Sequence, residues 1–288
     1  MFDVTSPSDP VDDSGEPLLQ RTRGEARCAF ARREGATVLS ALRQEGSLKV
    51  RFPRSEAGSP AEAVLLNTAG GLTDGDVLTF AGATEPGADV VFSTQASERI
   101  YRSRGGSATV ETRLSIGRSA RLGWLPQETI LFNGARLERT LDVDIEPTGT
   151  FLAHEATVFG RTAMGETVKV GLFNDRWRVR VDGRMIHADA VRIEGDIAKQ
   201  LARPGFLGGA SAMATVLLIG DGAETHLAAV RAILDGLPKD VALAGASAWN
   251  GKLVLRAVAH SGAHLRTLIT PVLHALQQGR GLPRVWTI

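Results

Sequence analysis

A chain of 288 residues with 43% hydrophobic and 23% charged residues has the composition of a soluble globular protein. Its formal net charge of +1 at pH 7 does not favour nucleic acid as a partner. The single cysteine, Cys28, excludes an intrachain disulfide and a cluster of thiolate metal ligands. We expect Cys28 to be a small buried residue.

The N-terminal segment, residues 1–19, contains five carboxylates, three prolines and no lysine or arginine. Such a segment can bury little apolar surface, and we expect a flexible acidic tail. It lacks the basic and apolar regions of a secretory signal. The apolar runs of the chain are too short to span a bilayer. These features predict a cytoplasmic protein that does not enter the membrane.

From residue 20 to about residue 195 the dominant hydrophobic period is two, which is typical of strands with one buried face. In 108–116, "ATVETRLSI", apolar and polar residues alternate, and 135–145 and 176–186 repeat the pattern. Turn signals such as "DGR" and "PTG" separate these runs. The pattern predicts a mainly β body with many antiparallel strands, in packed sheets or one strongly curved sheet. The sequence has no repeat of fixed length, so it does not predict a regular solenoid.

The remainder, about 196–288, has the pattern of an α/β segment with a few helices. Helical spacing of apolar residues occurs in 223–237 and 261–279, and 196–203 predicts a short helix. Ser261 is the expected N-cap of the last helix, and Pro271 is expected to kink it. Because the connections are short, we expect residues 20–288 to form a single domain.

The stretch "TAGGLTDGDVL", residues 68–78, combines glycines with carboxylates after an apolar run. A phosphate-binding loop requires lysine after its last glycine and a helix thereafter, whereas here Asp76 and a strand pattern follow. Gly70, Gly71 and Gly75 suit a turn, and Asp76 can accept hydrogen bonds from its main chain. The turn is the favoured interpretation, and a carboxylate metal site is the alternative.

Other candidate sites are less defined. The six histidines form no His-Glu-x-x-His pattern, and no Gly-x-Ser-x-Gly elbow occurs. In "SERIYRSRGG", residues 97–106, tyrosine and arginines indicate either a protein-binding surface or a solvated edge strand. Glu128 and Glu155 lie in apolar surroundings, where a carboxylate is either a turn residue or a buried acid with a partner.

Several segments, in order, resemble the family of urease accessory proteins called UreD or UreH. They are "LLNTAGGLTDGDVL", "STQASERIYRS", "LGWLPQETILFNGARLERTLDVDI", "HEATVFGRTAMGE", "RWRVRVDGRMIHADAVRIEG" and the terminal "LPRVW". Each segment alone is weakly specific, but six in this order cover nearly the whole chain after the tail. One departure is Asp74, which stands where the family pattern has a glycine.

The resemblance implies a β-rich fold without enzymatic activity or a tightly bound cofactor. It implies a scaffold in urease maturation that binds apo-urease and UreF, and through UreF the GTPase UreG that carries nickel. Transient passage of nickel requires weak oxygen ligands along an internal path. The expected ligands are the acids within the matching segments, and the expected partner-binding residues lie in 97–104. The former are Asp76, Glu128, Glu155 and Glu166, and the latter are Arg99, Tyr101 and Arg102.

An alternative function is a β-sandwich carbohydrate-active enzyme or sugar-binding module. Trp124, Trp177 and Trp249 would then present aromatic platforms to a sugar. The aromatic content of 5% is low for this function, and no pair of carboxylates at glycosidase spacing can be identified.

Overall fold

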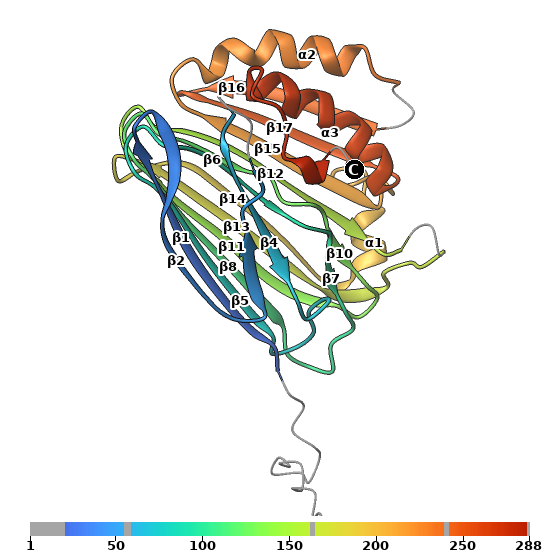
Figure 1. The fold of residues 1–288 in the computed structure, drawn as a ribbon. Helices are drawn as coiled ribbons and strands as arrows, with labels where there is room; N and C mark the ends of the chain where they lie inside the picture. Colours follow the sequence, from blue (N-terminus) through green and yellow to red (C-terminus); the bar gives the residue numbers. More distant parts are fainter. Residues whose placement is uncertain (1–20, 55–58, 162–164, 239–241, 287–288) are drawn as a thin grey trace, which may run out of the picture.

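The computed structural model describes residues 21–54, 59–161, 165–238 and 242–286. The predicted tail, residues 1–19, therefore lies outside the described residues. The described chain is built mainly of strands with a few helices, which confirms the mainly β class. Two sheets and a helical layer are stacked on one another (Figure 1).

The first sheet has seven strands in the order β14-β13-β11-β8-β5-β1-β2 within the described ranges. Its strands are β1 Arg23–Arg33, β2 Ala36–Gly46, β5 Val77–Thr84, β8 Ala108–Ile116, β11 Arg136–Ile145, β13 Val170–Val181 and β14 Arg184–Asp196. Burial alternates strictly along β5 and β11. One face of this sheet is therefore solvated, as the period of two predicts.

The second sheet has ten strands among the described residues, eight of them in the order β16-β17-β15-β12-β9-β6-β4-β3, with β10 beside β12 and β7 beside β10. Its strands are β3 Leu48–Arg51, β4 Ala61–Asn67, β6 Asp89–Thr94, β7 Glu98–Ile100, β9 Arg121–Trp124, β10 Thr129–Leu131, β12 Thr150–Phe159, β15 Ala212–Ile219, β16 Ala242–Trp249 and β17 Lys252–Ala259. In β12 nine consecutive residues are buried, because this sheet is covered on both faces.

Strand direction differs from the antiparallel prediction. The interior pairs of the seven-stranded sheet are parallel, and Val77, Thr109 and Glu138 are successive partners across β5, β8 and β11. The ten-stranded sheet is mixed: β4, β6, β9 and β12 run parallel, whereas β12, β15, β17 and β16 pair antiparallel. The seven-stranded sheet has antiparallel pairs at its two edges, β1 with β2 and β13 with β14. The chain passes from one sheet to the other after most strands, so the next strand in the same sheet runs in the same direction. The result is an irregular two-sheet coil, although the sequence has no repeat of fixed length.

The two sheets enclose one hydrophobic core, and the ten-stranded sheet shares a second core with the helices. Helices α2 Leu227–Asp235 and α3 Gly262–Gln277 cover this outer face, and α1 Ile197–Leu201 follows β14 (Figure 1). Short 3-10 turns occur at Ala223–His226 and Arg284–Trp286. No helix among the described residues is long and apolar enough to cross a membrane.

The last helix agrees with its predicted start. The Ser261 hydroxyl accepts a hydrogen bond from the His264 main-chain N–H at 3.2 Å, as an N-cap does. The helix continues through Pro271 as one element and ends where Gln278 adopts a left-handed conformation. Cys28 is buried, and this burial raises the pKa of its thiol to about 12. Cys28 is thus a packing residue without thiolate character.

Candidate functional site

The glycine-rich stretch 68–78 forms a turn that enters β5. Gly70, Gly71 and Gly75 have positive φ values of 76°, 147° and 78°. A Cβ atom on Gly71 would lie 2.4 Å from Cε2 of Tyr101, so the ring can pack there only against glycine. The Asp76 carboxylate accepts from the main-chain N–H groups of Thr22 at 2.7 Å and Thr73 at 2.8 Å. Asp76 therefore holds the turn together.

The carboxylates of Asp74 and Glu166 also form ion pairs and hydrogen bonds that hold loops in place. Asp74, which departs from the family pattern, is buried and forms an ion pair with Arg21 at 3.1 Å. Glu166 accepts from Nε of Arg161 at 2.8 Å and from the main-chain N–H of Asn133 at 3.3 Å. The Arg161 guanidinium lowers the pKa of Glu166. Neither Glu166 nor Asp76 lines the cavity described next.

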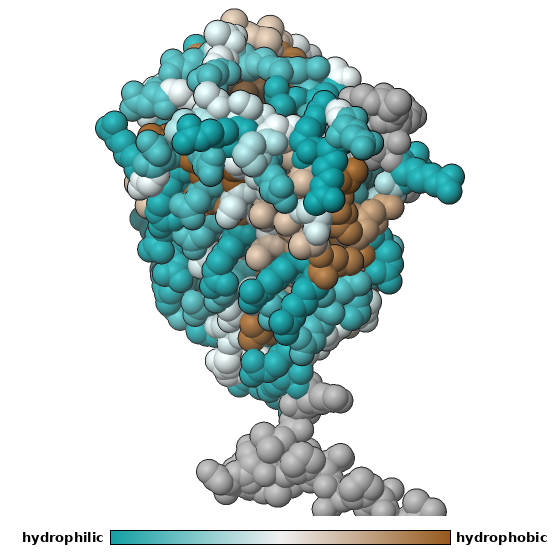
Figure 2. Space-filling view, turned by 60° about the vertical axis from the view of Figure 1, so that its left-hand side comes forward, coloured by the Kyte–Doolittle hydropathy of each residue, from teal (hydrophilic) through white to brown (hydrophobic). Residues whose placement is uncertain are grey.

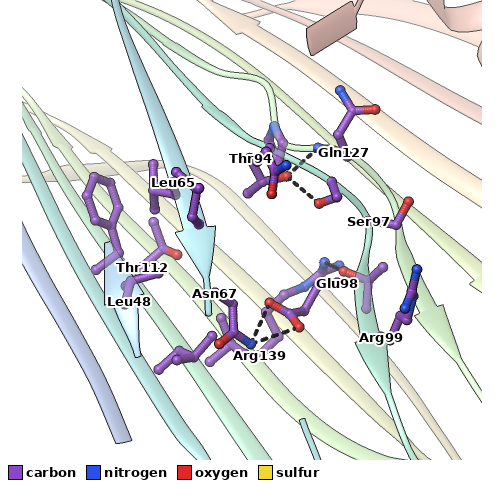
Figure 3. A pocket seen from close by; sticks show the side chains of 18 of the residues that line it. Leu48, Leu65, Asn67, Thr94, Ser97, Glu98, Arg99, Thr112, Gln127 and Arg139 are labelled. Carbon is purple, nitrogen blue, oxygen red and sulfur yellow. Dashed lines mark hydrogen bonds between the residues drawn. The ribbon is translucent and has the colours of Figure 1, made fainter. Parts of the chain in front are cut away.

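A cavity of about 230 Å³ lies between the two sheets, where the ten-stranded sheet divides beyond β12 into the strands β9, β6 and β4 on one side and β10 and β7 on the other. Leu48, Leu65, Leu78 and Phe80 supply apolar lining. Polar side chains from several strands line the same space (Figure 3); they include Asn67, Ser97, Glu98, Gln127, Arg139 and Glu155. The cavity therefore has a mixed lining, with polar and charged side chains set into an otherwise apolar core.

Glu98 lies at this cavity on β7. The Asn67 side-chain amide donates to both of its carboxylate oxygens, at 3.1 and 3.2 Å (Figure 3). Burial raises the pKa of Glu98 to about 7, although the Asn67 contact favours the charged form. Glu98 was not among the acids predicted from the sequence, because it stands in a polar, arginine-rich segment in which a carboxylate has the appearance of a solvated residue. The sequence signal that could have found Glu98 is the nearby Ile100, which anchors the short strand β7 in the core.

Arg139 and Asp175 are cross-strand partners on the inner face of the seven-stranded sheet. The guanidinium donates from Nε to Oδ1 at 3.0 Å and from Nη2 to Oδ2 at 2.8 Å, a two-pronged contact. Its Nη1 donates to the Thr129 hydroxyl at 3.2 Å. All three side chains are buried, so the pair is shielded from solvent.

Glu155 joins this pair from the opposite sheet. Its Oε2 lies 3.0 Å from Nη2 of Arg139, and its Oε1 accepts from the Trp124 indole N–H at 2.9 Å. The Oε2 contact is an ion pair and not a hydrogen bond, whereas the same Nη2 donates a hydrogen bond to Asp175. Burial raises the pKa of Glu155 to about 7 against the opposing effect of Arg139. One guanidinium thus faces two buried acids and links the two sheets.

Glu128 stands just outside the cavity lining. Its side chain is half-buried and accepts from the Ser97 hydroxyl at 2.8 Å. Its main-chain oxygen accepts from the N–H of Glu98 at 3.0 Å. Of the four acids chosen from the sequence, the structure places Glu155 on the cavity and Glu128 beside it. Asp76 and Glu166 lie in separate turns.

The polar strand 97–104 is not a free edge. β7 pairs with β10 on one side, and Leu72 bridges to Ile100 on the other. Arg99, Tyr101 and Arg102 are exposed, and the Tyr101 ring packs against Phe132 with centroids 5.1 Å apart. All three side chains therefore face the solvent, and Arg99 also lines the cavity.

The tryptophans do not form a sugar platform. Trp124 is buried and stacks on Phe80 at 5.7 Å, and Trp177 is buried in the same core. Trp249 is partly exposed, but the Lys252 ammonium lies 4.6 Å from its ring centroid. Burial of two of the three rings removes the observation on which the carbohydrate alternative depended.

The described residues contain no group of three or more His, Cys, Asp and Glu side chains arranged to hold a metal ion. His154, on β12, faces the helical layer and packs on Trp286 with ring centroids 5.1 Å apart. Burial and the charges of Arg139 and Arg266 lower the pKa of His154 to about 3, so the ring stays neutral. His154 is a packing residue in the second core.

Comparison with known proteins identifies the family. The family model described as UreD urease accessory protein matches residues 22–287. A urease accessory protein UreD of Rhizobium rhizogenes is 46% identical over 269 residues, which cover 93% of this chain and 96% of that protein. One of Brucella suis is 46% identical over 276 residues, covering 94% and 96%. The chain belongs to the UreD family of urease accessory proteins.

Proposed function

We propose that this protein is a urease maturation scaffold that binds apo-urease and a UreF–UreG complex and passes nickel to the urease active site through the cavity between its sheets. In this proposal the protein makes and breaks no covalent bonds, works in the cytoplasm and holds nickel only in transit. Family membership supports the role in urease maturation. The partners and the route of the ion are the proposed parts.

The observation that carries the proposal is the polar cavity that opens inside an apolar core. Three glutamates line the same space of about 230 Å³: Glu98, Glu111 and Glu155. Glu111 is paired with Arg113 at 2.6 Å, which leaves Glu98 and Glu155, both on strands of the ten-stranded sheet, as the candidate ligands. Ni²⁺ accepts carboxylate oxygens, and conduction requires ligands that bind weakly enough to release the ion.

Arg139 makes Glu155 a still weaker ligand. Its guanidinium lies 3.0 Å from Glu155 and repels any cation that approaches the same oxygen. The proposed path therefore depends on Glu98 and Glu155 as successive weak ligands, with Glu128 beside them. Because Asp76 and Glu166 are committed to main-chain donors of their turns, we no longer place them on the path.

Exposed apolar and aromatic side chains supply partner surface. Leu243 is 70% exposed, and eight other large hydrophobic residues in the part of the chain that the structure describes are exposed, Tyr101 among them. Figure 2 shows a mostly hydrophilic face on which apolar side chains gather in one patch below the helical layer. Exposed apolar patches on a soluble chain mark interaction sites. We place part of the UreF or urease contact at Arg99, Tyr101 and Arg102, beside the cavity.

The path is tested by transfer of radioactive nickel into apo-urease in the reconstituted complex. The double variant Glu98→Gln with Glu155→Gln removes both charges at nearly constant volume. We expect at least a tenfold loss of nickel in urease, with the complex still captured in a pull-down. Glu138→Gln is the matched control, because Glu138 precedes Arg139 on β11 and faces the other side of the sheet. Normal transfer by the double variant would refute the route.

The partner surface is tested separately. Alanine at Arg99, Tyr101 and Arg102 together is expected to weaken capture of UreF or of urease by more than tenfold. The three side chains are exposed, so the triple variant should keep its fold, which circular dichroism checks. Capture of both partners at wild-type levels would exclude this surface.

A further inference from the structure

The C-terminal segment, residues 284–286, is seated on the connection between β9 and β10. Trp286 is buried, and its indole N–H donates to the main-chain oxygen of Leu125 at 2.9 Å. The next two residues of this connection, Pro126 and Gln127, line the cavity between the sheets. The C-terminal segment therefore lies directly behind one wall of the cavity.

Arg266 of α3 joins the C-terminal segment to this wall. Its Nη1 donates to Oε1 of Gln127 at 2.7 Å, and its Nη2 donates to the main-chain oxygen of Trp286 at 3.0 Å. The Trp286 ring also lies 5.1 Å from the guanidinium carbon. Nε2 of Gln127 donates to the main-chain oxygen of Val285 at 3.2 Å. Both polar atoms of the Gln127 side chain are thus held from the side of the C-terminal segment.

The same connection holds the acid of the cavity, Glu98. The main-chain N–H of Gln127 donates to the Thr94 hydroxyl at 2.9 Å (Figure 3). The main-chain oxygen of Glu128 accepts from the N–H of Glu98 at 3.0 Å, and its carboxylate accepts from the Ser97 hydroxyl at 2.8 Å. Hydrogen bonds therefore run without a break from the C-terminal segment through residues 125–128 to the strand that carries Glu98.

One buried group opposes the seating of Trp286. The ring of His154 packs edge-to-face against that of Trp286, with centroids 5.1 Å apart. His154 is 2% exposed, and its Nδ1 has no hydrogen-bond partner among the described residues. A buried polar atom without a partner costs free energy, which is recovered when water reaches it. Release of Trp286 would admit that water, so the seat is held by hydrogen bonds and weakened by His154.

We propose that residues 284–286 form a releasable latch on the wall of the cavity. With the latch seated, Trp286 and Arg266 fix the connection 125–128 and, through it, the position of Glu98. With the latch released, the connection and the strand that carries Glu98 are free to move. The regulatory role of the latch rests on the proposed function, because the cavity is the route proposed there for nickel. The coupling of the latch to the wall does not rest on that function.

Hydrogen exchange of the full chain, followed by mass spectrometry, tests the coupling. In Trp286→Ala we expect the main-chain N–H groups of 94–100 and 125–131 to exchange at least fivefold faster than in the wild type. Gln127→Met removes the same contacts from the other side and should give the same pattern. Trp286→Phe keeps a ring but lacks the N–H donor, so its effect should be intermediate.

Two further variants separate the latch from a general loss of stability. His154→Phe removes the unpaired nitrogen, so exchange of both segments should become at least twofold slower than in the wild type. Val230→Ala is the matched control: Val230 is buried on α2, which packs on β16, and both segments should exchange within twofold of the wild type. Equal acceleration by Trp286→Ala and Val230→Ala, or faster exchange in His154→Phe, would overturn the latch.

The regulatory role is tested by transfer of radioactive nickel into apo-urease in the reconstituted complex. Trp286→Ala should lower transfer at least threefold with the complex still captured in a pull-down, and Val230→Ala should transfer as the wild type does. Faster exchange in Trp286→Ala together with wild-type transfer would refute the regulatory role. The exchange measurements use neither urease nor nickel, so a failure of the latch and a failure of the proposed maturation function are told apart.

Discussion

Two regions of this molecule use carboxylates in opposite ways. In the turn at residues 68–78 and in the loop contacts of Glu166, Asp76 and Glu166 accept from main-chain N–H groups close in space. In the cavity between the sheets, Glu98 accepts from the side-chain amide of Asn67, and Glu155 faces the guanidinium of Arg139. A turn acid is therefore well supplied with main-chain donors, whereas burial raises the pKa of each of the two cavity acids to about 7. The comparison shows that apolar flanking sequence does not by itself mark a functional carboxylate.

The largest expected effect on stability comes from Arg139, which faces the buried acids of the cavity. Arg139→Met leaves Asp175 and Glu155 buried without a cation, and we expect a loss of about 3–5 kcal/mol in the free energy of unfolding. Urea unfolding followed by circular dichroism measures it. Arg113→Met is the control, because Arg113 is exposed and should cost less than about 0.5 kcal/mol. A loss below about 1 kcal/mol for Arg139→Met would show that the buried charges are stabilised by something else.

The next largest expected effect on stability comes from the glycines of the turn at residues 68–78. Gly71→Ala places a Cβ atom 2.4 Å from the Tyr101 ring and 2.8 Å from the Arg99 main-chain oxygen, and should cost about 2–3 kcal/mol. Gly70→Ala also has positive φ but meets open space, so about 1 kcal/mol is expected. Thermal unfolding of the two variants provides the matched comparison. Equal costs would mean that strain, and not contact with Tyr101, dominates at both positions.

Removal of a turn acid should have an intermediate effect. Asp76→Ala leaves the N–H groups of Thr22 and Thr73 without their acceptor, and we expect a loss of about 1–2 kcal/mol in chemical denaturation. Asp76→Asn retains one acceptor oxygen and should lose roughly half as much. If nickel transfer fell sharply in Asp76→Asn while stability did not, the assignment of Asp76 to the turn alone would be wrong.

The smallest expected effect is a pH dependence from Glu98. Because its pKa rises to about 7 on folding, from an ordinary value of 4.5, the folded state binds the proton more tightly. Its contribution to stability is complete below about pH 4.5 and is lost as the pH rises through 7. Glu98→Gln should remove this loss and gain on the order of 1 kcal/mol over the wild type between pH 5 and 8. Unfolding at four pH values checks it, with the exposed Glu45→Gln as a flat control.

The turn at residues 70–76 was accessible to sequence reasoning because its causes are local. Glycines with positive φ and an Asp that accepts from neighbouring N–H groups need only a few residues to define them. Glu155 was also found, since a carboxylate among buried residues implies a partner. The identity of that partner was not accessible: Arg139 lies on a strand of the other sheet and reads as one more alternating arginine. Glu98 was missed for the same reason, because its burial comes from strands distant in the sequence.

The sequence by itself determined the strand-rich body, the capped C-terminal helix, the turn before β5 and membership in the UreD family, because each is written in local periodicity or in ordered motifs. The tertiary structure decided that the interior strands of the seven-stranded sheet run parallel, that two acids share one arginine across the sheets, and that a cavity with polar side chains opens beside them. A period of two reports which face of a strand is buried, but it is the same for either strand direction. Direction, partners and cavities arise only when segments far apart in the chain are brought into contact.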